Sequence, residues 1–244
     1  MRTRVFLIML LYNSTALFAF ENSMPNLTVP SELQTGQMRL TIQHRFYGRV
    51  NDRPGETFFG VFDAGANTML GLRAALGRRF EANAFYVSMI KEYQLGMGFG
   101  FSLGTQFSGL VEARYFSFRT SFDRRESSVF LLGTLQSRAV AKRCRPVVNV
   151  GYDGYWDRFG LGLGLGINVL ERLSLLGEFF PQVDPEPNYR DAKSGFTAGF
   201  RIRTYGHFFL FLIGNSFDIG SRQMMRGAEN NDLHLGFSIQ RLID

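Results

Sequence analysis

Residues 158–170, which read RFGLGLGLGINVL, alternate strictly between large apolar and small side chains. A β-strand sends successive side chains to opposite faces, so this segment would carry one apolar face and one nearly bare face. Glycine inside a strand normally weakens it, which makes a soluble β-sandwich a poor explanation. The pattern is typical of a transmembrane β-barrel strand, with one face on lipid and the other on the lumen. The apolar face would carry Phe159, Leu161, Leu163, Leu165, Ile167 and Val169.

The glycines of this run do not form a dinucleotide-binding fingerprint. After Gly160 and Gly162, the third glycine of that motif should stand at residue 165, which is Leu165. The motif also opens a helix, and no helical pattern follows here. The run therefore favours a barrel wall over a phosphate-binding loop.

Similar segments recur along the chain from residue 38 onwards. Transmembrane strands need about 9–11 tilted residues, and twelve segments are long enough. Aromatic residues make up 15% of the chain, which suits a lipid-facing surface with aromatic girdles. The predicted strands are 38–47, 65–76, 80–89, 92–103, 108–118, 129–140, 145–154, 158–169, 173–183, 195–205, 207–217 and 231–241.

The links between these strands alternate in length. Those after the second, fourth, sixth, eighth and tenth strands are short, whereas those after the first, fifth, ninth and eleventh are long and polar. An even-stranded barrel with both termini in the periplasm has short periplasmic turns and longer external loops. The link after the third strand is also short and departs from that rule. The sequence predicts one all-β, antiparallel, up-and-down barrel of about twelve strands over residues 38–244, in a Gram-negative outer membrane.

The N-terminus resembles a secretory signal peptide. Arg2 and Arg4 precede an apolar stretch at Val5–Leu11, and small residues before Ala19 suit cleavage there. We therefore assign residues 1–19 to a signal peptide. Residues 20–37 are polar and contain prolines, which predicts a mobile periplasmic arm.

Several motifs are similar, in order, to an uncharacterised family of bacterial outer-membrane β-barrel proteins, classed as a domain of unknown function. The resemblance implies the barrel and its location but no chemistry. Tyr205 stands where the family pattern has a second glycine, which affects only one periplasmic turn. The motifs are His44-Arg45-Phe46, Phe58-Phe59-Gly60, Asp63-Ala64-Gly65-Ala66-Asn67, Thr204-Tyr205-Gly206-His207-Phe208-Phe209, Gly214-Asn215-Ser216 and Leu233-His234-Leu235-Gly236-Phe237.

Enzymatic activity is not expected. An outer-membrane phospholipase would need a serine near a histidine base, and none of the three histidines has a serine two residues later. The scattered histidines do not make a metal site by spacing, so we expect no catalytic residue, metal or cofactor. Aspartates near the loops, where an omptin-like protease keeps its acids, are also common turn formers. These are Asp63, Asp153, Asp157 and Asp184.

The inward face carries more arginine than acid, which favours passage or binding of small anions. Alternatively, these side chains pair with one another and fill the lumen. The glycine faces would widen the lumen, or make room for a constriction by Phe58, Phe59 and Phe62 of the first long loop. For His234, which also faces inward, we expect a hydrogen bond across the barrel seam. The other predicted inward residues are Arg39, Arg45, Arg73, Arg114, Arg201 and Arg203, with Glu81, Glu112, Asp153 and Glu178.

These patterns predict a non-enzymatic channel or binding barrel for small, anionic solutes. The alternative is a structural or anchoring barrel that supports a partner complex, and an outer-membrane hydrolase is a third option. Expected partners are outer-membrane lipids and lipopolysaccharide, whereas the dispersed net charge of +6 does not favour nucleic acid. Residues 221–230, with Arg222, Met224, Met225 and Arg226, would contact lipopolysaccharide phosphates or form a solvated loop.

Overall fold

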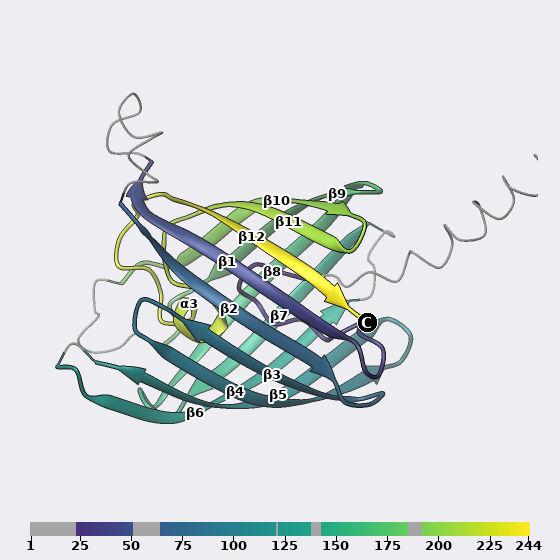
Figure 1. Cartoon of the computed structure of the whole chain (residues 1–244), viewed down its shortest axis with the longest axis horizontal. Coiled ribbons are helices and arrows are strands. Elements are labelled where there is room, and N and C mark those ends of the chain that lie inside the picture. Colours follow the sequence, from purple (N-terminus) through teal and green to yellow (C-terminus); the bar gives the residue numbers. More distant parts are fainter. Residues whose placement is uncertain (1–22, 51–63, 121, 138–142, 185–191) are drawn as a thin grey trace, which may run out of the picture.

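The computed structural model describes residues 23–50, 64–120, 122–137, 143–184 and 192–244. Its twelve strands form a closed antiparallel barrel in which each strand pairs with its neighbours in sequence (Figure 1). The first and last strands close the wall, with Met38 opposite Ile243 and Arg45 opposite Gly236. The predicted fold class and strand number are confirmed.

The strands follow the segments expected from the alternation, with shifts of a few residues at their ends. They are β1 (Met38–Arg49), β2 (Ala66–Ala75), β3 (Phe80–Val87), β4 (Glu92–Leu103), β5 (Phe107–Arg119), β6 (Arg125–Ser137), β7 (Cys144–Asp153), β8 (Arg158–Leu170), β9 (Leu173–Phe180), β10 (Gly195–Thr204), β11 (His207–Gly214) and β12 (His234–Ile243). One short helix, α3 (Ser221–Met224), lies between β11 and β12. Within the described ranges, no helix has the length and apolar character needed to cross a membrane.

The wall has an apolar outer face and a polar inner face. In β8, Leu163 and Leu165 are exposed on the outside while Gly160 and Gly162 are buried on the inside. Other strands also expose large apolar side chains, such as Leu95 at 61% and Met97 at 60%. A contiguous apolar exterior of this kind is the surface that a barrel presents to acyl chains.

Substitution of Leu131 by arginine tests this lipid-facing surface. Leu131 lies halfway along β6 and is 48% exposed on the outer face. An arginine near the bilayer midplane should cost about 2–4 kcal/mol of folding free energy, because its charge must leave water. Val183→Arg is the matched control, since Val183 is 52% exposed but lies beyond the end of β9. Urea titration in lipid vesicles measures both, and equal losses of stability would contradict the assigned membrane band.

Two segments that are not wall strands fill the lumen (Figure 1). Ser23–Pro30, here called the N-terminal plug, is buried throughout and enters from the end that carries the short turns. The connection between β11 and β12 spans residues 215–233, and its part 215–231, here called the loop plug, folds inward from the opposite end together with α3. The expectation of a mobile arm is therefore wrong for residues 23–30. The predicted signal peptide lies outside the described residues.

The prediction for residues 221–230 also needs correction. Arg222, Met224 and Met225 are exposed by only 1%, 0% and 8%. They form neither a solvated loop nor a surface for lipopolysaccharide, because their side chains are buried inside the barrel. Arg222, for example, pairs with Glu92 of the wall, and Met225 packs against Gly160. The lumen thus holds two plugs, one from each end of the barrel.

Candidate functional site

The inner wall holds the N-terminal plug through backbone groups and through the side chains of Ser23, Asn26 and Thr28. The Glu178 carboxylate accepts hydrogen bonds from the backbone N–H groups of Asn26 and Leu27, both at 2.8 Å. Asn149 bonds Thr28 twice: its Oδ1 accepts the Thr28 N–H and its Nδ2 donates to the Thr28 carbonyl, each at 2.8 Å. A segment with buried peptide groups needs such partners, since unpaired ones would cost free energy.

Two arginines hold the ends of the N-terminal plug. Arg201 donates to the Ser23 carbonyl at 3.1 Å, and Arg73 donates to the Val29 carbonyl at 3.0 Å. Both side chains belong to residues that the alternation predicts to face inward. Their charge is thus directed at backbone oxygens of the plug.

The glycines of β8 make room for the apolar side chains of both plugs. A Cβ atom at Gly162 would overlap Leu27, and one at Gly164 would crowd Leu27 and Met24. A Cβ at Gly160 would overlap Met225 of the loop plug. The bare face of the RFGLGLGLGINVL run therefore packs against plug side chains. It does not border an open channel in this structure.

A buried ion triad anchors the loop plug. The Arg222 guanidinium lies between Glu92, which it contacts at very short range, and Asp153, at 2.6 Å. The three side chains are exposed by 1%, 0% and 8%. The guanidinium also lies 4.0 Å from the ring centroid of Phe116, a cation–π arrangement. Breaking such a buried pair is costly because it leaves an uncompensated charge.

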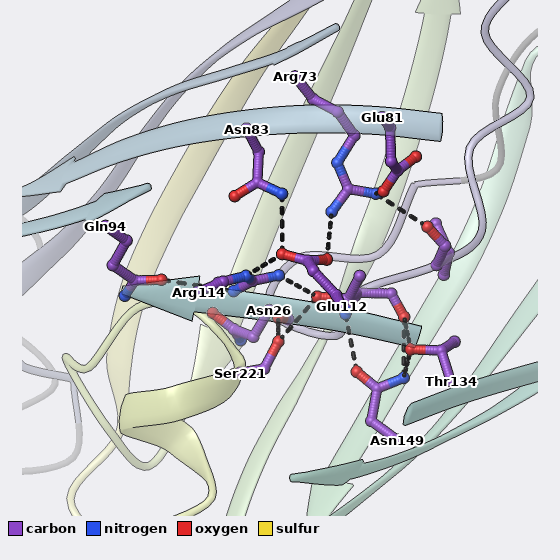
Figure 2. Close-up of polar contacts among 12 residues, drawn as sticks. Asn26, Arg73, Glu81, Asn83, Gln94, Glu112, Arg114, Thr134, Asn149 and Ser221 are labelled. Carbon is purple, nitrogen blue, oxygen red and sulfur yellow. Dashed lines mark hydrogen bonds and ion pairs between the residues drawn. The ribbon is translucent and has the colours of Figure 1, made fainter. Parts of the chain in front are cut away.

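The two plugs contact each other at the centre of the lumen. Ser221 Oγ donates to the Asn26 carbonyl at 2.9 Å and lies 3.1 Å from Thr28 Oγ1. The Gly220 N–H donates to Asn26 Oδ1 at 3.2 Å. Each plug thus supplies hydrogen-bond partners to the other (Figure 2).

A network of charged side chains lines the wall of β2 to β5 beside the N-terminal plug (Figure 2). Arg73 lies 3.2 Å from Glu81 and 3.6 Å from Glu112. Glu112 also pairs with Arg114 and accepts a hydrogen bond from Asn83 at 2.8 Å. These pairs match the alternative in which inward charges neutralise one another. Arg114 and Asn83 occupy the space that a Cβ at Gly96 would need.

The predicted inward residues lie on the inner face, although their surroundings differ. Arg203 is partly buried near the short-turn end, where it donates to the Glu171 carbonyl at 2.9 Å. His234 Nδ1 lies 3.2 Å from the Phe46 carbonyl across the β1–β12 seam, so the expected seam contact is present. Phe58, Phe59 and Phe62 lie outside the described residues. Arg39 is partly buried, and the fully buried members are Arg45, Arg73, Glu81, Glu112, Arg114, Asp153, Glu178, Arg201 and His234.

Three residues that organise the lumen, Glu92, Asn149 and Arg222, were not assigned to it from the sequence. Glu92 shares the polar face of β4 with Gln94 and Gly96, so the same alternation could have placed it inside. Asn149 likewise lies on the buried face of β7. Arg222 carries no such signal because it lies in a connection without strand periodicity.

The two ends of the lumen differ in charge. At the short-turn end, Arg201 experiences repulsion from Arg39, Arg145 and Arg203, offset by attraction to Glu32. Arg145 itself pairs with Glu32 at 2.8 Å, beside a cavity of about 510 Å³. At the other end, the two acids of the triad, Glu92 and Asp153, share the cation of Arg222. The excess of arginine therefore lies at the short-turn end of the lumen.

The described residues contain no group of three or more histidine, cysteine or acidic side chains that could hold a metal ion. His207 and His234 each contact a main-chain carbonyl, of Tyr205 and Phe46 respectively.

The fold is shared with an outer-membrane porin of known structure. The KdgM porin superposes with a TM-score of 0.55 at 6% identity, covering 83% of this chain and 98% of that one. The NanC porin gives a TM-score of 0.48 at 8% identity, covering 84% and 98%. Outer membrane phospholipase A from Escherichia coli gives 0.47 at 14% identity, covering 93% and 96%. At 6% identity, the likeness to the KdgM porin concerns the fold alone.

A search of curated proteins found no match. A family profile described as "Membrane bound beta barrel domain (DUF5777)" matches residues 147–243. The motifs between His44 and Asn67 lie outside that match, so their part of the resemblance stays a prediction. The chain is an outer-membrane β-barrel, and its predicted resemblance to this family is confirmed over residues 147–243.

Proposed function

We propose that this barrel is a channel for small anionic solutes, closed at rest by its two plugs. One observation carries the proposal: the lumen is filled by segments that contribute no strand to the wall. The twelve strands close on themselves through the β1–β12 pair, so neither plug is needed to close the wall. Among the described residues, the only β-bridge that the loop plug would break on leaving is the isolated one between Ala228 and Lys193. A barrel filled only by its own wall side chains would offer no such path.

The anionic preference follows from the charge at the short-turn end. Withdrawal of the segment that includes the N-terminal plug would remove Glu32 from Arg145 and the Ser23 carbonyl from Arg201. Both guanidinium groups would then face the lumen. A pore constriction lined by arginine favours anions over cations because of its positive potential.

Replacement of both Arg201 and Arg203 by serine tests this selectivity. In a planar bilayer with a KCl gradient, the open channel should show an anion-selective reversal potential, which moves toward zero in the double variant. Arg158→Ser at the opposite end serves as control, because Arg158 is partly exposed and paired with Asp184. An unchanged reversal potential would remove Arg201 and Arg203 as selectivity residues.

A structural or anchoring barrel is the second candidate. The interlocked plugs favour it, since a permanently filled lumen suits a scaffold more than a pore. The two functions differ in one measurement. A barrel that stays silent at every voltage, even after both plugs are loosened by mutation, would exclude the channel and leave the anchor.

A further inference from the structure

The N-terminal plug is held as a receptor holds an extended peptide. Several of its bonds to the wall use backbone N–H groups at Asn26, Leu27 and Thr28 and backbone carbonyls at Ser23, Thr28 and Val29. The side chains of Ser23, Asn26 and Thr28 add further bonds, to Gln240, Glu178, Thr197, Gln43 and Arg114. Wall side chains make all of these contacts. The backbone part of this recognition does not depend on the identity of the peptide's side chains. The side-chain bonds restrict the accepted peptides to those with polar residues at the positions of Ser23, Asn26 and Thr28.

One apolar pocket adds selectivity to this backbone recognition. Leu27 lies over Gly162 and Gly164, in the space that Cβ atoms there would take. Phe180 and Val147 close the same pocket, because they too lie close to those Cβ positions. An aliphatic side chain fits this pocket, whereas a charged one would be buried there without a partner.

The wall beside the plug has hydrogen-bonding capacity that the plug does not use. The guanidinium of Arg45 is 1% exposed, and its three nitrogens have no hydrogen-bond partner among the described residues. Arg45 is attracted electrostatically to Glu178, the residue that binds the Asn26 and Leu27 N–H groups. The N-terminal plug thus leaves hydrogen-bond donors of the site unused, and a different peptide can bond them.

We propose that the lumen is a binding site for extended peptides with an aliphatic side chain at the position of Leu27. Ser23–Pro30 is its resident occupant, and other peptides of the same chemistry enter from the short-turn end. Peptide binding does not require ion conduction, so the experiment tests it independently of the proposed channel function.

The experiment separates the resident segment from β1 by proteolytic cleavage after the barrel has folded. A specific protease site replaces residues around Gln34 and Thr35, which are exposed between the plug and β1. The full-length protein is folded in detergent, cleaved and washed. A fluorescent peptide with the sequence of residues 23–30, blocked at both ends, is then titrated and followed by anisotropy. Saturable binding in the micromolar range is expected.

Three altered peptides separate backbone recognition from side-chain fit. N-methylation at Leu27 removes the N–H that Glu178 accepts, and binding should weaken about tenfold or more. Leu27→Asp in the peptide should weaken it at least as much. A sequence that keeps Ser23, Met24, Asn26, Leu27 and Thr28 and differs at the remaining positions should bind within about tenfold of the parent peptide. No effect of N-methylation would overturn backbone recognition.

Two barrel variants provide a matched pair. Gly162→Leu fills the pocket of Leu27 and should abolish tight binding. Gly133→Leu adds the same atoms on β6, where a Cβ meets only a backbone oxygen at 3.9 Å, and should leave binding unchanged. If the cut fragment stays bound, its dissociation rate by mass spectrometry becomes the readout, and it should be faster in Gly162→Leu only.

Several outcomes would overturn the proposal. The cut fragment could leave while no peptide rebinds at millimolar concentration. The cleaved barrel could lose its heat-modifiable gel mobility, in which case the segment is a structural part and not a ligand. Equal behaviour of the Gly162 and Gly133 variants would also refute the assigned pocket.

Discussion

Replacement of Arg222 by methionine is expected to expel the loop plug from the lumen. The substitution keeps the side chain's length but leaves Glu92 and Asp153 as buried carboxylates without their shared cation. Removing one member of a buried ion pair costs about 3–5 kcal/mol, which the loop can avoid by moving out to solvent. Limited proteolysis of residues 215–231 should therefore speed up strongly, while the barrel keeps its heat-modifiable gel shift.

Two controls isolate the buried charge as the cause. Arg158→Met breaks the pair with Asp184 at the same end, but both of those side chains are 34% exposed. The hydrogen bond from Arg158 lowers the pKa of Asp184, yet an exposed pair of this kind contributes little to stability because water screens it. The triple variant Arg222→Met, Glu92→Gln and Asp153→Asn removes all three charges and should restore most protection. If Arg222→Met alone leaves the loop as protected as before, the triad is not its anchor.

The fold was predictable because wall strands obey one physical rule. The run at 158–170 shows it most clearly: apolar side chains meet lipid and small ones meet the lumen, so their alternation is visible locally. Strand ends were less predictable. The sixth strand was expected at 129–140 and is found at Arg125–Ser137, because its first residues are polar and show no apolar alternation. The twelfth starts at His234 and not at 231, since residues 231–233 belong to the preceding loop.

The contents of the lumen were not predictable in the same way. The plugs lack a repeating pattern, and their partners are distant in sequence: Asn26 bonds Glu178, 152 residues away, and Arg222 bonds Glu92, 130 residues away. The glycines of β8 did indicate space inside the barrel. The described residues that fill it are Met24, Leu27 and Met225, which no local signal singles out.

Replacement of Leu27 by aspartate is expected to displace the N-terminal plug. The aspartate would lie among Gly162, Gly164 and Phe180, where it has no cation, and burying an unpaired carboxylate costs several kcal/mol. Protease cleavage within residues 23–30 of the purified barrel should rise sharply. Glu32→Gln is the control, because its pair with Arg145 is partly exposed at the mouth and should contribute little.

The consequence for conduction depends on how the plugs are coupled. The two plugs enter from opposite ends and meet where Ser221 bonds Asn26. Loss of one plug leaves the other plug in the lumen but removes the hydrogen bonds between the two. Residues in contact typically show coupling energies of about 0.5–3 kcal/mol. Leu27→Asp combined with Arg222→Met should therefore conduct far more than the sum of the single variants in a planar bilayer. A double variant that conducts no better than the more active single one would show that a single plug closes the lumen and that the contact between Ser221 and Asn26 has no part in gating.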